Sequence, residues 1–376
     1  MRKTILLIGD LKSSYLTQYI ENVLEPLDFD IFMQIPKEEE NIAKDFIFVH
    51  KIHLIKIHER SDNPFYRVRY FGGFLRRIMN IFELSKENRF DYIHIHFVEE
   101  YALFIANWAR SKKTKLYASF WGSDLLRQTE KYLKREKKYL TNYEVITGDS
   151  FVLQDKYKRI YPKLRVRFEW VPFGVSLIPF IDKYSDDVNA CKQFLGFPLN
   201  KKIVAIGYNA IRQQQHAEVL SELKKIENKS EYFLVFQMSY GKSDGNYLPD
   251  LLVQIEKSEF EYKVFKDYLS MDDLAKLRIA TDIFINAQTT DAFANSFIEN
   301  VYTKSIIINA KWLHYPELDM FPLYVNEFSD FNEIPSLLEK RIDDEKLAWN
   351  KKCIENRTWE NCRKQWAKAY GVEYKE

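Results

Sequence analysis

Several features that define whole classes of protein are scarce or missing in this sequence. Only three cysteines occur among its 376 residues. Their spacing fits no metal site, and a reducing compartment is the simplest interpretation. No apolar run approaches the ~18 residues of a membrane span. With 56 basic and 54 acidic residues, the net charge of +2 argues against a dedicated nucleic-acid-binding protein. The sequence also lacks internal repeats and low-complexity segments.

The overall composition is typical of a soluble globular protein. Hydrophobic residues make up 46% of the sequence and charged residues 29%. A chain of 376 residues is too long for one ordinary core, so two domains are expected. The first residues, MRKTILLIGD, contain an apolar stretch that is too short for a signal peptide. We therefore predict a first buried strand there, and a cytoplasmic protein.

Short apolar segments alternate with amphipathic segments through both halves of the chain. Strands are predicted at residues 4–8, 92–97, 115–120, 145–147, 166–171, 202–207, 232–237, 262–265, 281–285 and 305–308. The alternation predicts an α/β protein of two Rossmann-like, doubly wound domains that face each other across a cleft. We place the domains at residues 1–178 and 188–355, with a linker around 172–187. Residues 356–376 are predicted to form a helix that packs across the domain junction.

The segment from residue 281 to residue 299, TDIFINAQTTDAFANSFIE, predicts a strand, a polar loop and a helix. The start of a helix attracts anions, because its backbone N–H groups are unpaired. On one helix, Asp291 and Glu299 would lie ~12 Å apart along the axis. Hydrolase carboxylate pairs are only ~5 to 9.5 Å apart, so the spacing instead suits a nucleotide-sugar. The alternative is that Asp291 caps the helix and that Glu299 is a solvated surface residue.

The same segment resembles the E-x7-E motif of retaining glycosyltransferase family 4, which has the two-domain glycosyltransferase-B fold. The preceding FKDYLSMDDLAKLRIATDIFINA resembles the elements before that motif. In the N-terminal half, DYIHIHF, FWGSDLL and VPFGV resemble three further landmarks of the family in the right order. The resemblance covers most of the chain.

The resemblance assigns donor-binding roles to this segment. Asp291 would hold the hydroxyls of the donor sugar, and Glu299 would hold the ribose. The backbone amides of Ala292, Phe293 and Ala294 would hold sugar and phosphate. The family usually has glutamate at the first acidic position and glycines where Ala292 and Ala294 stand, so the sugar specificity is expected to differ.

A second loop, residues 206–216, is similar to the loop that grips the donor diphosphate in this family. Arg212 suits that role because a guanidinium group matches phosphate oxygens. The usual lysine is absent, and His216 or Gln215 stands at about its place. A His216 that must be protonated would make catalysis more dependent on pH. The alternative for His216 is a helix-start residue that faces solvent. Asn209 and Tyr240 are assigned to the donor site through a similarity to 4-acetamido-fucose transferases of lipid-linked glycans.

The N-terminal half supplies further candidate residues. His94 and His96 alternate along one strand, and His96, nearest the strand end, is expected to face the cleft. The resemblance implies that His96 contacts the donor sugar, and the alternative for each histidine is a hydrogen-bonded core residue. Gly122 permits a tight turn and Asp124 is expected to meet the acceptor, with a cap as the alternative.

Two segments are basic and amphipathic. Residues 65–84 interleave aromatic residues with arginines, and residues 127–138 carry six basic residues against two glutamates. Such segments suit anionic membrane surfaces or lipid-diphosphate acceptors. For the second segment, a solvated charged helix is the commoner explanation.

These observations predict a glycosyltransferase that moves a sugar from a nucleotide-diphosphate donor to a hydroxyl of a growing, lipid-linked surface glycan. The catalytic residues would be Asp291, His96 and Arg212. The resemblance implies retention at the anomeric carbon and neither metal nor cofactor; the Asp28-Phe29-Asp30 triplet lies outside the donor segment. A peripheral position on the inner face of the cell membrane fits the basic segments. Two alternatives are a nucleotide-sugar epimerase and a non-catalytic nucleotide-sugar-binding subunit.

Overall fold

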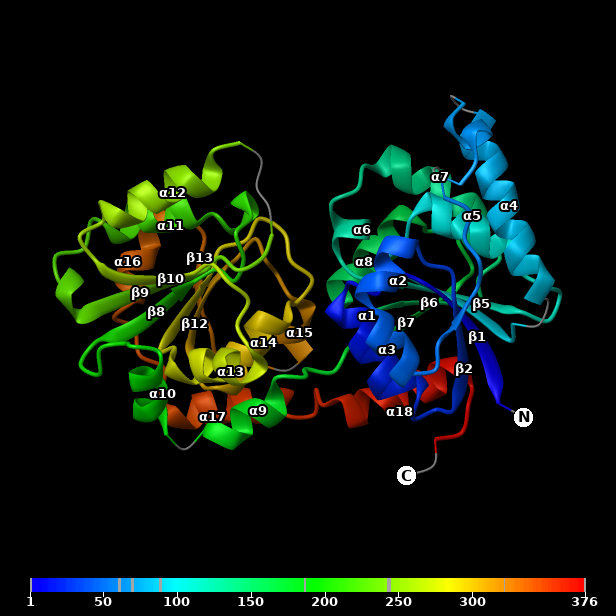
Figure 1. Ribbon diagram of the computed structural model, residues 1–376. Helices are drawn as coiled ribbons and strands as arrows, with labels where there is room; N and C mark the ends of the chain where they lie inside the picture. Colours follow the sequence, from blue (N-terminus) through cyan, green and yellow to red (C-terminus); the bar gives the residue numbers. More distant parts are fainter. Residues whose placement is uncertain are drawn as a thin grey trace. The chain divides into compact units, whose positions relative to one another are not determined.

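The computed structural model describes residues 2–59, 62–68, 71–87, 90–185, 187–241, 245–320 and 322–374 (Figure 1). The chain divides into two compact units. Unit 1 is Met1–Gly174 together with Trp359–Glu376, and unit 2 is Val175–Thr358. Among the described residues, no helix combines the length and apolarity that crossing a membrane requires.

Unit 1 contains a sheet of seven parallel strands in the order β3-β2-β1-β4-β5-β6-β7. The strands are β1 (Lys3–Ile8), β2 (Phe29–Met33), β3 (His53–Leu54), β4 (Tyr92–His96), β5 (Lys115–Phe120), β6 (Val145–Gly148) and β7 (Arg167–Trp170). Buried apolar residues such as Ile5 and Ile93 alternate with others that are equally buried, as expected of a sheet covered on both faces. Strands β2 and β3 are added on one side of β1, and β4 to β7 on the other side, so the strand order changes direction between β1 and β4.

Helices cover both faces of this sheet. They are α1 (Ser14–Tyr19), α2 (Lys37–Ile42), α3 (Lys44–Val49), α4 (Phe71–Glu87), α5 (Glu100–Ala109), α6 (Ser123–Leu126), α7 (Glu130–Leu140), α8 (Phe151–Ile160) and α18 (Trp359–Tyr370). Some begin at side-chain caps: the Thr129 side chain accepts from the Tyr132 amide at the start of α7, and Ser150 caps α8 in the same way.

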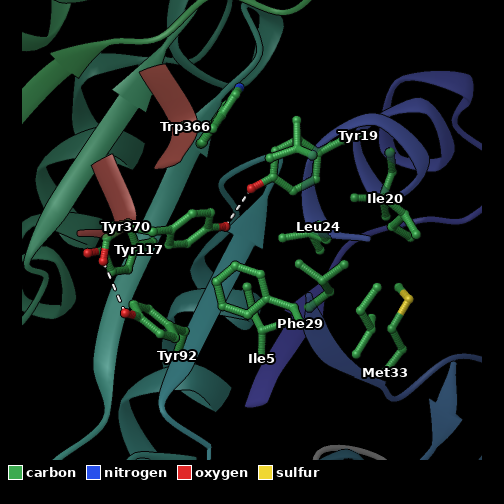
Figure 2. Packing of buried hydrophobic residues seen from close by; sticks show 14 of the residues in the cluster. Ile5, Tyr19, Ile20, Leu24, Phe29, Met33, Tyr92, Tyr117, Trp366 and Tyr370 are labelled. Carbon is green, nitrogen blue, oxygen red and sulfur yellow. Dashed lines mark hydrogen bonds between the residues drawn. The ribbon is translucent and has the colours of Figure 1, made fainter. Parts of the chain in front are cut away.

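The core of unit 1 includes the last helix of the chain. Figure 2 shows Trp366 and Tyr370 of α18 among the side chains of the N-terminal sheet and of α1. The Tyr370 hydroxyl shares hydrogen bonds with Tyr19 and with His94, and Tyr92 donates to the Tyr370 carbonyl at 3.0 Å. Trp366 and Tyr370 are fully buried. The helix that we predicted to pack across a domain junction thus fills the core of unit 1.

Unit 2 contains a sheet of six parallel strands in the order β10-β9-β8-β11-β12-β13. The strands are β8 (Lys202–Ile206), β9 (Tyr232–Gln237), β10 (Glu261–Phe265), β11 (Ile283–Asn286), β12 (Ile306–Ala310) and β13 (Asn326–Phe328). Its helices are α9 (Ile178–Tyr184), α10 (Val188–Phe194), α11 (His216–Leu223), α12 (Tyr247–Glu256), α13 (Met271–Ala280), α14 (Asn295–Tyr302), α15 (Pro316–Met320), α16 (Ile334–Leu337) and α17 (Asp344–Ile354).

The predicted linker at residues 172–187 contains a helix, α9. Pro179 stands in its first turn, where the missing N–H of proline costs nothing, and Ile178 and Ile181 are buried. This helix was not predicted from the sequence, because it is short and has a proline in its first turn.

The strand order of unit 2 changes direction at β8, which lies between β9 and β11. Parallel strands end at the same edge of a sheet, and loops diverge at such a reversal to leave room for a ligand. The loops that follow β8 and β11 therefore lie at the position where α/β proteins bind ligands.

Candidate active site

The loops after β8 and β11 are tied together by hydrogen bonds. Gln214 Nε2 donates to Gln288 Oε1 at 2.5 Å, and Gln215 Nε2 donates to the Ala287 carbonyl at 2.5 Å. The Thr289 amide donates to the Gln213 carbonyl at 2.8 Å. The two segments that the sequence assigned to the donor site are therefore neighbours in unit 2.

Asp291 lies in the loop before α14, four residues ahead of the helix. Its carboxylate accepts hydrogen bonds from the Tyr315 hydroxyl at 2.6 Å, the Tyr208 hydroxyl at 3.4 Å and the Ala294 amide at 3.1 Å. Burial, and then the charge of Asp291, raise the pKa of Tyr315 well above its ordinary value, so Tyr315 remains a donor. Because Ala294 occupies the position before the first helical residue, Asp291 is not the helix cap that we considered as the alternative.

The turn between Asp291 and α14 has a left-handed residue, Phe293, at φ +66°. A non-glycine residue in this conformation costs about 1–2 kcal/mol. The buried Phe293 ring packs against Tyr315 with centroids 5.2 Å apart and against Phe297 at 5.4 Å, and this packing holds the turn. The Ala294 amide, which we expected to bind the donor, is used by Asp291, and Ala292 lies half-buried in the same turn.

Glu299 lies within α14 and is only 8% exposed. Its carboxylate accepts from Arg278 Nε at 2.9 Å, and Arg278 on α13 also donates to Gln237 Oε1 at 3.1 Å and Ser296 Oγ at 3.3 Å. The alternative of a solvated Glu299 is therefore wrong. The motifs do not single out Arg278, although one arginine within the apolar run LAKLRIATDIF indicates a buried charge that needs a partner.

Tyr240 and Asn209 stand at the ends of β9 and β8. The Tyr240 ring stacks on Tyr268 with centroids 6.2 Å apart, and burial raises the pKa of its hydroxyl to about 12. Asn209 is buried, and its side-chain oxygen accepts from the Ile211 amide at 3.1 Å. The Arg212 guanidinium is exposed and lies 4.7 Å from the centre of the Tyr247 ring. Arg212 is thus placed at the ligand edge of the sheet, as a phosphate-binding residue requires.

His216 begins α11 and is fully buried. Its Nδ1 lies 2.9 Å from the Tyr247 hydroxyl. The ring also approaches Gly207, where an added Cβ would come within 2.7 Å of Nε2. Burial lowers the pKa of His216 to about 3, so the ring is neutral near pH 7. The expectations that His216 faces solvent, or acts as a cation for the diphosphate, do not fit this environment.

The burial of His216 leads to a prediction about pH. The unfolded chain protonates this ring below its ordinary pKa of 6.5, whereas the folded protein does not until about pH 3, so the stability that His216 supports is lost as pH falls. For His216→Gln, we expect the stability advantage of the wild type to shrink by ~2 kcal/mol between pH 7 and pH 5. Urea unfolding of both proteins at each pH measures this difference. The contribution of the other titrating groups is the same in both proteins and drops out of the comparison. A difference that stays constant with pH would contradict a neutral, buried His216.

In unit 1, both histidines of β4 are buried. His94 pairs with Tyr370 and, through Nε2, with Ser119 Oγ at 2.7 Å. His96 is 1% exposed, and its ring lies 4.4 Å from that of Tyr19. Among the described residues, neither of its nitrogens has a hydrogen-bond partner, and burial lowers its pKa to about 3. His94 is thus a hydrogen-bonded core residue, and His96 does not open to a cleft as we expected.

Asp124 binds backbone amides of two neighbouring loops. Its carboxylate is fully buried and accepts from the amides of Val98 at 2.8 Å, Trp121 at 3.0 Å and Gly122 at 2.9 Å. Burial raises its pKa to about 6. Gly122, at φ +132°, makes the turn into α6. The carboxylate joins the loops after β4 and β5, so a direct contact with an acceptor, as we predicted, does not fit this arrangement.

No cluster of three or more metal-ligating side chains occurs in the described part of the chain. Asp28 and Asp30, the acids of the Asp-x-Asp triplet, lie 2.7 Å and 3.6 Å from Arg2. A cavity of about 780 Å³ lies in unit 1 rather than at the loops of β8 and β11, and Lys37, Lys56 and Met79 are among its lining residues.

Comparisons with known proteins agree with this architecture. Residues 4–147 match the model of a family described as glycosyl transferase 4-like. No curated protein matches the sequence. Among solved structures, a glycosyltransferase from Rickettsia africae is 14% identical, with a TM-score of 0.73 and 98% of each chain covered. Anabaena HepE in complex with UDP and glucose is 13% identical, with a TM-score of 0.72 over 99% of this chain and 100% of that one.

Sucrose-phosphate synthase from Thermosynechococcus elongatus is likewise 14% identical, with a TM-score of 0.71 and 98% of each chain covered. The two parallel-sheet units therefore form a glycosyltransferase-B fold. The match to the glycosyl transferase 4-like family is confined to residues 4–147, in agreement with the resemblance of the motifs in the N-terminal half, and the solved structures support the fold of the whole chain.

Proposed function

We propose that the protein transfers a sugar from a nucleoside-diphosphate donor and that the loops after β8 and β11 hold this donor. The observation that carries the proposal is the environment of Asp291. Its carboxylate is fixed by Tyr208 and Tyr315 at the carboxyl end of a parallel sheet, in the loop that leads into α14. A carboxylate oriented by two hydroxyl donors is well placed to accept hydrogen bonds from sugar hydroxyls.

The remaining groups fit the other parts of such a donor. Arg212, exposed in the loop after β8, would bind the diphosphate and stabilise the negative charge of the departing nucleotide. Glu299, oriented by Arg278, retains acceptor capacity for a ribose diol. HepE was crystallised with UDP and glucose, and this supports uridine nucleotides as the first donors to test.

The transfer itself needs little acid–base chemistry from the protein. The bond between the anomeric carbon and the diphosphate oxygen breaks, and the acceptor hydroxyl forms the new bond while its proton passes to the leaving diphosphate. Positioning of the two substrates and stabilisation of the diphosphate account for the rate. We propose retention at the anomeric carbon; a contact of His96 with the sugar, which the resemblance implied, does not fit its burial. The proposed acceptor is a lipid-linked surface glycan bound by unit 1.

One observation favours a second candidate, a subunit that binds nucleotide-sugar without turnover. The resemblance places His216 or Gln215 where the usual phosphate-binding lysine stands, and His216 is buried and neutral. Arg278 already neutralises Glu299. Such a protein would bind donor but would not hydrolyse it, whereas a transferase should hydrolyse donor slowly.

A thermal-shift screen of nucleoside diphosphates and their sugar conjugates tests the donor site. We expect one nucleotide to raise the melting temperature, with a stabilisation of about 2.7 kcal/mol at 100 times its Kd. EDTA should leave this shift unchanged. Asp291→Asn should lose the extra shift given by the sugar, whereas the exposed Asp250→Asn on α12 should keep it. The absence of a shift with every nucleotide would overturn the donor site.

A further inference from the structure

The outward side of α4 is apolar, which is the reverse of an ordinary surface helix. Phe71, Phe74, Ile78 and Phe82 are 57%, 58%, 43% and 54% exposed, whereas Gly72, Asn80 and Leu84 on the opposite side are buried. Figure 1 shows α4 on the outside of unit 1, next to α5. At about 100° per residue, the four exposed positions form a stripe roughly 80° wide along the helix.

The stripe continues into the turn before α4, where Phe65 is 65% exposed and Val68 is 50% exposed. We call the set Phe65, Val68, Phe71, Phe74, Ile78 and Phe82 the α4 face. Single exposed apolar residues are common, but six within 18 positions of the chain, four of them phenylalanine, mark a surface that binds a partner.

Basic side chains accompany the α4 face. The described part of residues 64–87 contains four basic residues, Arg67, Arg76, Arg77 and Lys86, against two glutamates. The Arg77 guanidinium lies 5.0 Å from the centre of the Tyr101 ring on α5, and the Lys86 ammonium lies 4.9 Å from the Phe82 ring. Trp108 on α5 adds a further exposed aromatic ring, at 66%. Apolar rings beside arginines are typical of helices that lie in the head-group region of a membrane.

We infer that the α4 face docks on an anionic phospholipid bilayer, with α4 lying parallel to the membrane surface and its phenylalanines among the acyl chains. A second copy of the chain is a poorer occupant, because a two-fold contact would bring the basic flanks of two α4 helices together. A lipid surface instead supplies both the apolar interior and the negative charge.

A cavity lies next to α4. Met79 lines the cavity of about 780 Å³ together with Lys37, Lys56 and Asn63. Glu40 and Asp62 line the cavity as well, and Lys37 Nζ lies 3.2 Å from Asp62 Oδ1, so the cavity adds no anion site to the docking surface. The docking surface itself is argued from α4 alone and does not depend on the donor site.

Flotation with lipid vesicles tests the inference. The wild-type chain should bind vesicles that contain 30% phosphatidylglycerol at low salt, and at least tenfold less should bind to pure phosphatidylcholine or in 0.5 M NaCl. Phe74→Glu/Phe82→Glu should lose binding at least tenfold. Both side chains are more than half exposed, so the variant should keep the wild-type melting temperature. Arg76→Gln/Arg77→Gln should weaken only the preference for the anionic lipid.

The matched control is Phe48→Glu. Phe48 is 84% exposed on α3, but residues 37–49 carry four acidic and two basic residues, so this segment should not dock on an anionic surface. Its replacement should leave vesicle binding unchanged. The inference is overturned if the wild type does not float with the anionic vesicles, or if the double phenylalanine variant binds as well as the wild type. It is also overturned if the α4 face makes a dimer in solution that the double variant dissolves. Because the assay contains no nucleotide, its result is independent of the proposed donor site.

Discussion

Replacing Arg212 by alanine is expected to lower the turnover of the bound nucleotide-sugar by about 10²–10³-fold, the usual cost of losing one donor that stabilises developing negative charge. Arg212 is exposed at the ligand edge of unit 2, so the melting temperature should change little. Slow hydrolysis of the donor identified by thermal shift provides the assay, because it needs no acceptor.

Two further variants sharpen this result. Arg212→Lys keeps the charge but loses the guanidinium fork, so we expect an intermediate rate. Arg341, another exposed arginine of unit 2, is the control, and Arg341→Ala should retain full turnover. A parallel loss of fold and activity in Arg212→Ala would refute the assignment of Arg212 to the diphosphate.

The second large effect concerns the buried ion pair between Arg278 and Glu299. Arg278 is 2% exposed and Glu299 is 8% exposed, so Arg278→Leu leaves a carboxylate buried without its partner. We expect this change to lower the free energy of unfolding by about 3–5 kcal/mol. Urea unfolding measures the loss, and Arg341→Leu on the surface should cost less than about 0.5 kcal/mol.

The double variant Arg278→Leu/Glu299→Gln separates the structural role of Glu299 from its proposed contact with ribose. Removing the orphaned charge should recover more than half of the stability lost in Arg278→Leu. The recovered protein should still bind nucleotide more weakly than the wild type if Glu299 holds the ribose. Wild-type affinity in this variant would leave Glu299 with a structural role alone.

Much of the fold could be predicted because its elements follow local patterns. The strand Tyr232–Gln237 was predicted with the same bounds, and Tyr92–His96 with one residue more, since continuous apolar runs specify strands buried on both faces. The basic, aromatic segment at residues 65–84 was predicted to be amphipathic, and α4 covers Phe71–Glu87.

The missed features depend on contacts between distant parts of the chain. The spacing of Trp359, Trp366 and Tyr370 indicates a helix with one apolar side but not the sheet that this side covers. The burial of His96, Asp124 and His216 follows from neighbours on other elements, which spacing alone does not reveal. The loop segments that carry Asp291 and Arg212 could be found by motif, whereas the tyrosines that orient Asp291 come from other segments, 83 and 24 residues away along the chain.

The place of α18 in the core of unit 1 sets the order in which the two units can be completed on the ribosome. Unit 2 is one continuous segment, Val175–Thr358, and its whole sequence is available before α18 is made. Unit 1 receives Trp366 and the Tyr370 hydroxyl, which joins Tyr19 to His94, only after unit 2 has been synthesised. The half of the protein that is translated first can therefore complete its core only when the last helix has been made, and until then its sheet lacks the cover that Trp366 and Tyr370 provide.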